Sequence, residues 1–120
     1  MDAVALVLSA VDGPSQGSAK LTLTIGNHLV EDMVWYFGFE RSDDVGVERV
    51  EFDQALERLE KVGYKVHEGD KAWEHFSRIR AKYAFGLNSM ARRFAIIPAQ
   101  WIGDRSYIPH RPGRVPRRTA

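Results

Sequence analysis

One arginine stands in the sequence where an apolar residue is expected. Between Lys71 and Ile97, eight residues follow one another at steps of three and four, as on one face of a helix: Trp73, Phe76, Arg80, Tyr83, Leu87, Met90, Phe94 and Ile97. Seven of these eight are apolar or aromatic, so Arg80 is expected to be buried. An unpaired buried guanidinium costs several kcal/mol. We therefore expect a structural ion pair between Arg80 and Asp32 or Glu31, with an anion or ligand site around Arg80 as the alternative.

A second group of polar residues has the spacing of metal ligands. His28, Glu31 and Asp32 lie at positions i, i+3 and i+4, which places them on one face of a helix. Di-iron helical bundles repeat a Glu-x-x-His pair on several helices, and no such second pair occurs here. A single histidine on a mostly apolar helix is more often a hydrogen-bonded structural residue. No metal site and no cofactor are expected.

The sequence contains no recognisable catalytic motif. Its serines lack the G-x-S-x-G context, and neither a P-loop nor a G-x-G-x-x-G motif occurs. The absence of cysteine excludes disulfides, cysteine zinc sites, iron–sulfur clusters and thiol nucleophiles. We expect no catalytic residues and no enzymatic activity.

Charge is divided unevenly along the chain. Residues 1–74 contain 7 Lys/Arg and 15 Asp/Glu, whereas residues 75–120 contain 10 Lys/Arg and one acid, Asp104. The acidic part is expected to neutralise the basic helix within the fold. Six arginines near the C-terminal end are candidates for binding an anion or a phosphate group. They are Arg92, Arg93, Arg111, Arg114, Arg117 and Arg118.

The hydrophobic pattern predicts a small all-α domain, a four-helix orthogonal or bundle-like fold with a long C-terminal helix. The expected helices cover residues 2–11, 19–39, 50–62 and 71–97. Asp2, Ser18 and Asp70 are the expected N-caps. The second helix is apolar nearly all round, so we expect it to be buried between the others. Gly86 within the long helix predicts either a close helix crossing or a bend.

The predicted domain covers residues 1–102, and residues 103–120 are expected to form an irregular, flexible basic tail. The first apolar run, from Ala3 to Leu8, is far shorter than the roughly 20 residues that cross a bilayer. The chain is therefore not expected to span a membrane itself, although it could be a soluble part of a membrane protein.

Several phrases of the sequence resemble a known family. They are residues 5–13 (ALVLSAVDG), 19–21 (AKL), 79–84 (IRAKYA) and 97–102 (IPAQWI). Together they resemble the cytoplasmic C-terminal region of actinobacterial potassium-channel-like membrane proteins. In that family an L-x-S-A-V-D segment precedes a leucine-rich helix, and an L-R-x-x-Y helix precedes a proline–tryptophan end. No selectivity-filter motif is present.

The resemblance implies a non-enzymatic cytoplasmic domain, regulatory or for assembly, that lies beneath a membrane-embedded channel region. The basic tail would then lie near the anionic inner face of the cell membrane. The alternative is a free-standing helical module whose Arg-rich end binds nucleic acid or an acidic protein. The sequence gives no indication of an oligomeric state.

Overall fold

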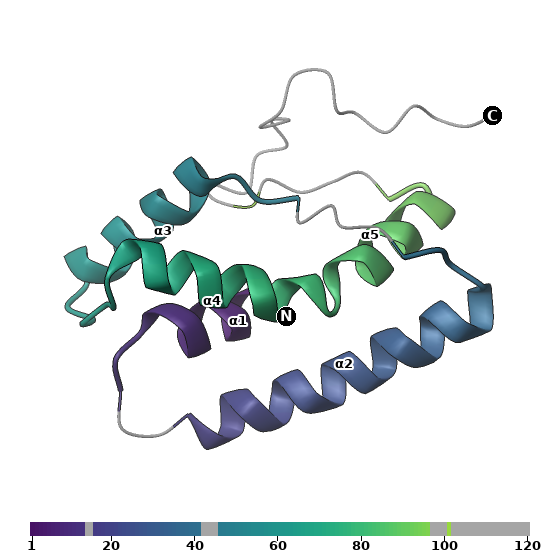
Figure 1. Ribbon diagram of the computed structural model, residues 1–120, viewed down its shortest axis with the longest axis horizontal. Coiled ribbons are helices and arrows are strands. Elements are labelled where there is room, and N and C mark those ends of the chain that lie inside the picture. Colours follow the sequence, from purple (N-terminus) through teal and green to yellow (C-terminus); the bar gives the residue numbers. More distant parts are fainter. Residues whose placement is uncertain (14–15, 42–45, 97–100, 102–120) are drawn as a thin grey trace.

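The computed structural model describes residues 1–13, 16–41, 46–96 and 101, and these residues form an all-α structure, which confirms the predicted fold class (Figure 1). Its five helices are α1 (Asp2–Ala10), α2 (Gly17–Phe37), α3 (Arg49–Lys61), α4 (Gly69–Ala81) and α5 (Ala84–Arg93). Val11 and Val66 form an isolated antiparallel β bridge. The bridge joins the loop that follows α1 to the connection between α3 and α4.

The core lies between α1, α3 and α4. Helix α1 packs closely on α4, and α3 packs on α4 beside it. Ala5 of α1 and Ala72 of α4 are almost completely buried, and such small side chains allow two helix backbones to approach. Phe52 and Phe76 are fully buried with their ring centroids 5.0 Å apart, and the Trp101 ring lies 5.8 Å from Phe76. The predicted inward face is thus confirmed from Trp73 to Tyr83.

The predicted helix from Lys71 to Ile97 is two helices, and the prediction of a single long helix is wrong. The chain leaves α4 at Lys82 and enters α5 at Ala84, although neither glycine nor proline occurs at the turn. Two tertiary contacts account for the change of direction. The Tyr83 hydroxyl is bound to Asp2, and Gly86 lies against Val30 of α2. Helix α5 then ends at Arg93, before the expected stop at Pro98.

The three predicted N-caps are also wrong. None of the side chains of Asp2, Ser18 or Asp70 caps a helix; α1 and α2 begin without a side-chain cap. Helix α4 is capped by Glu68, which accepts hydrogen bonds from the backbone N–H groups of Asp70 and Lys71. The Asp2 carboxylate is unavailable for capping because it binds side chains of other elements.

Helix α2 is not buried between other helices, contrary to expectation. Of its 21 residues only Val30 is buried. Helix α2 contacts α1 and α5 along one side, and Figure 1 shows it along one edge of the molecule. Helix α1 has nine residues and spans about 14 Å, so it covers less than half of the roughly 31 Å of α2. No helix in the described residues is both long enough and apolar enough to cross a bilayer.

Gly86 provides a test of how α5 packs on α2. A Cβ atom at this position would lie 2.5 Å from Cγ1 of Val30 and 2.9 Å from Cγ2 of Val34. Helix propensity alone would make Gly86→Ala stabilising by about 1 kcal/mol, but overpacking costs about 1–3 kcal/mol. We expect a net loss of stability of up to about 2 kcal/mol in chemical denaturation. Gly17→Ala is the matched control, because nothing lies within 4 Å of its Cβ position. A stabilised Gly86→Ala protein would contradict this packing.

Candidate functional site

The most connected polar group of the described structure is the carboxylate of Asp2. Arg80 donates from Nε to Oδ1 at 3.0 Å and from Nη2 to Oδ2 at 3.1 Å. The Tyr83 hydroxyl donates to Oδ1 at 2.6 Å, and Nε1 of Trp101 donates to Oδ2 at 2.9 Å. We call these four residues the Asp2 cluster. It joins the first turn of α1 to the end of α4, to the α4–α5 turn and to Trp101.

The surroundings of the Asp2 cluster alter the acid–base properties of its members. Burial by itself raises the pKa of Asp2, but the hydrogen bonds from Arg80, Tyr83 and Trp101 and the charge of Arg80 outweigh it, so the pKa is lowered. Burial and the bond to Asp2 raise the pKa of Tyr83. The cluster therefore holds an ionised carboxylate and a neutral phenol. This combination suits a structural ion pair rather than a proton-transfer site.

The predicted partner of Arg80 requires correction. Arg80 is 8% exposed and has a carboxylate partner, but that partner is Asp2 and not Asp32 or Glu31. Asp32 and Glu31 both lie on exposed positions of α2, which contacts α1 and α5. The sequence signal for Asp2 is an acid at the start of an apolar helix, which reads equally well as an N-cap.

The guanidinium of Arg80 has few donors available for the alternative, a ligand site around Arg80. Its Nε and Nη2 groups are bound to Asp2, and Nη1 is buried without a hydrogen-bond partner. Nη1 of Arg80 and the side-chain amide of Asn88 both lie near Gly46. One buried NH2 group beside an amide does not make a carboxylate or phosphate site, which uses the bidentate fork that Asp2 already occupies.

Of the predicted anion-binding arginines, two lie in the described residues. Arg92 and Arg93 are exposed in the last turn of α5, where cations offset the helix dipole. Arg92 donates a hydrogen bond to Ser89 Oγ, and the Arg93 guanidinium lies over the Phe37 ring at 5.8 Å. Arg111, Arg114, Arg117 and Arg118 lie outside the described residues, as does the predicted tail.

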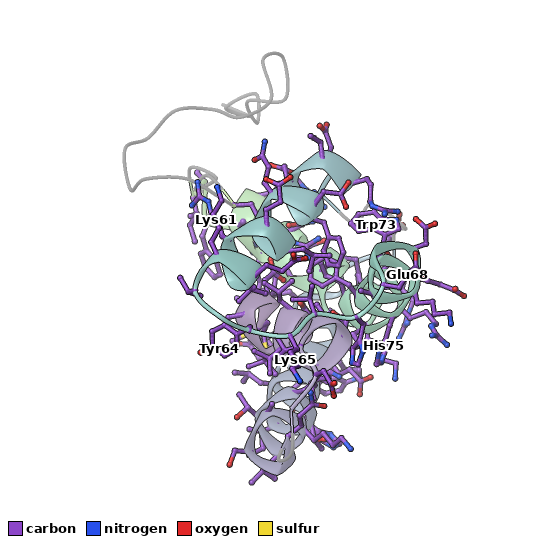
Figure 2. The ribbon with its side chains drawn as sticks, turned by 90° about the vertical axis from the view of Figure 1, so that its left-hand side faces the viewer. Lys61, Tyr64, Lys65, Glu68, Trp73 and His75 are labelled. Atoms are coloured by element: carbon purple, nitrogen blue, oxygen red, sulfur yellow. The ribbon has the colours of Figure 1, made fainter. Side chains whose placement is uncertain are left out.

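A polar hollow lies beside the start of α4. Its lining includes Ser9, His67, Glu68, Lys71, His75 and Arg78. Figure 2 shows Glu68 and His75 on this side of the molecule. The Ser9 hydroxyl donates to the carbonyl of Ala5 at 2.7 Å, so it is not directed at either histidine. No group of three metal-ligating side chains occurs in the described part of the chain.

A large apolar surface on α2 was missed by the sequence reasoning. Five large side chains of this helix are more than half exposed: Leu21 (62%), Ile25 (61%), Leu29 (54%), Trp35 (84%) and Tyr36 (75%). We call them the α2 apolar face. Figure 2 shows α2 at the lower end of the view, below α1. Because the pattern on α2 is apolar nearly all round, it could not show which side stays uncovered.

Comparison of the chain with protein-family models, with curated proteins and with solved structures gave no match.

Arg80→Ala tests the structural role of the Asp2 cluster. The substitution leaves the Asp2 carboxylate partly buried without its cation, which costs about 3–5 kcal/mol for a buried pair. Chemical denaturation followed by circular dichroism measures this loss. Arg78→Ala removes an exposed arginine of the same helix and should change stability by less than about 0.5 kcal/mol. Equal effects of the two substitutions would mean that the ion pair contributes nothing specific.

The lowered pKa of Asp2 predicts a pH dependence of stability. Its ionised form stabilises the fold fully above the ordinary pKa of 3.8, and this contribution is lost as the pH falls through the lower folded-state pKa. The stability difference between the unmodified protein and Asp2→Asn should therefore be largest near neutral pH and shrink in the acid range. Denaturation at a series of pH values measures it, with the exposed Asp12→Asn as control. A difference that stays constant down to about pH 3 would contradict the linkage.

Proposed function

We propose that this chain is a non-enzymatic helical assembly domain on the cytoplasmic side of a potassium-channel-like membrane protein. The observation that carries the proposal is the α2 apolar face. Monomeric proteins rarely expose contiguous apolar patches larger than a few hundred Å², and larger patches mark surfaces that bind another protein or a membrane. A helix with Trp35 and Tyr36 both more than 70% exposed is suited to such a contact.

Two of the phrases on which the resemblance to the channel-like family rests supply residues of the Asp2 cluster. The phrase at residues 79–84 supplies Arg80 and Tyr83, and the phrase at residues 97–102 supplies Trp101. These three side chains meet on one carboxylate, that of Asp2. Two of the four phrases therefore supply the side chains that bind Asp2, near the start of the chain. They leave α2 as the element available to a partner.

The proposal assigns no chemistry to the domain. The polar hollow beside α4 has no serine directed at a histidine, and the Asp2 cluster is occupied by its own hydrogen bonds. The alternative function, binding of nucleic acid or an acidic protein through the Arg-rich end, depends mainly on residues outside the described part of the chain.

Immunoblotting of the source cells with antibodies against this chain tests the proposed function. A domain of a membrane protein should appear in a band heavier than 13.6 kDa, in the membrane fraction, and should resist extraction with alkaline carbonate. Protease added to intact spheroplasts should leave the epitope uncut until the cells are lysed. A 13.6 kDa band in the soluble fraction would overturn the proposal and favour the free-standing module.

A further inference from the structure

We propose that the α2 apolar face binds the same face of a second copy of this chain, with the two α2 helices antiparallel. This inference rests on the assembly function proposed above and names the partner. It is carried by the order of residues along the exposed side of α2, which is complementary to itself when one copy is reversed.

The exposed side of α2 has the spacing of a coiled-coil seam. Leu21, Ile25, His28, Asp32 and Trp35 follow one another at steps of four and three, the spacing that keeps residues facing a partner helix. All five positions are exposed. The opposite side of α2 is already used, since Val30 and Val34 lie against Gly86 of α5. The seam is therefore the side of α2 that remains for a second helix.

Reversal of one copy brings complementary residues together. Consider an antiparallel pair in which residue 30 of one copy lies opposite residue 30 of the other. A residue that precedes position 30 by some number then faces the residue that follows position 30 by the same number in the other copy. Ile25 then faces Trp35, and His28 faces Asp32. Each contact occurs twice because the pair has twofold symmetry. A parallel pair would instead place Asp32 against Asp32, which is unfavourable.

The charges on α2 favour a protein helix over a lipid surface. Helices that lie on membranes are rich in Lys and Arg on their polar side, which attract anionic lipids. Helix α2 contains one such residue, Lys20, against two acids, Glu31 and Asp32. Neither His28 nor Asp32 forms a hydrogen bond or ion pair with another described side chain. Both remain available for the contact between copies.

The size of the surface indicates a weak, reversible dimer. A single pair of helices about 31 Å long buries less than the roughly 1,600 Å² of a standard stable interface. Domains fixed to one membrane protein experience effective concentrations on the order of millimolar, so weak pairing is sufficient there. The measurement on the isolated chain must therefore extend to high concentration.

Sedimentation equilibrium of the full chain from about 1 µM to about 1 mM is the first test. We expect a monomer–dimer equilibrium that Ile25→Glu weakens roughly tenfold to a hundredfold, because it places two carboxylates in the seam. Ile25 is 61% exposed, so the far-UV circular dichroism should be unchanged. Val62→Glu is the matched control: it alters another exposed apolar residue, which lies outside α2 and is 73% exposed, and should leave the association unchanged. A monomer at every concentration, or equal effects of the two substitutions, would overturn the proposal.

Charge exchange tests the antiparallel order. His28→Asp places two acids opposite each other, and Asp32→Lys places two basic groups opposite each other, so each variant alone should associate more weakly. An equimolar mixture should associate again, because each contact then joins an acid to a base. His28→Lys should associate at least as well as the original chain. Failure of the mixture to associate more strongly than its two components would overturn the antiparallel pairing.

Cysteine cross-linking provides an independent measure of the orientation, since the chain contains no cysteine. A mixture of Ile25→Cys and Trp35→Cys should form disulfide-linked dimers under mild oxidation. Ile25→Cys alone should not, because its two copies are about 15 Å apart along the pair and a disulfide needs Cα atoms within about 7 Å. Efficient linking of Ile25→Cys alone would indicate a parallel pair and overturn the proposal. The cell fractionation above is independent of these results, so a channel domain that fails to dimerise is distinguishable from a chain with another function.

Discussion

One carboxylate connects the two ends of the described fold. Asp2 lies at the first residue of α1, and the side chains that bind it lie 78, 81 and 99 positions further along the chain. Without Asp2, Arg80 would be a buried cation with no partner, a situation that folded proteins avoid. The position of α1 against α4 therefore depends on this contact as well as on the small residues Ala5 and Ala72. The direction of α5 depends on it too, because Tyr83 is the residue of the turn that directly precedes α5.

The turn at Tyr83 determines what α2 can contact. A straight helix from Lys71 to Ile97 would have continued along the axis of α4. Because the chain turns, α5 reaches α2, and Gly86 permits a close approach to Val30. Helix α2 is thereby held along one side, while Leu21, Ile25 and Trp35 face outward. The proposed dimer uses this division: one side of α2 belongs to the core and the other to a second copy.

The sequence indicated two places for a functional site: Arg80 and the exposed arginines Arg92 and Arg93. In the structure both are already engaged in contacts within the chain. Arg80 is used within the core, and its remaining Nη1 amino group does not form a site. Arg92 and Arg93 are exposed at the end of α5, but each already contacts a neighbouring side chain. Helix α2, which was expected in the core, carries more exposed large hydrophobic residues than any other described helix. Apolar residues such as Ile25 and Leu29 led to the prediction that this helix is buried. An apolar pattern indicates that a surface is covered, but it does not show whether the same chain or a second chain covers it.

The sequence by itself determined the all-α class, the positions of α1, α2 and α3 to within about two residues, the inward face from Trp73 to Tyr83, and the need of Arg80 for an acid. These properties depend on local periodicity and on the cost of burying a charge. Only the tertiary structure decided that the acid is Asp2, that the long helix divides at Tyr83, and that α2 is covered on one side. Those properties depend on contacts between residues far apart in the chain, and local periodicity does not specify which distant elements meet.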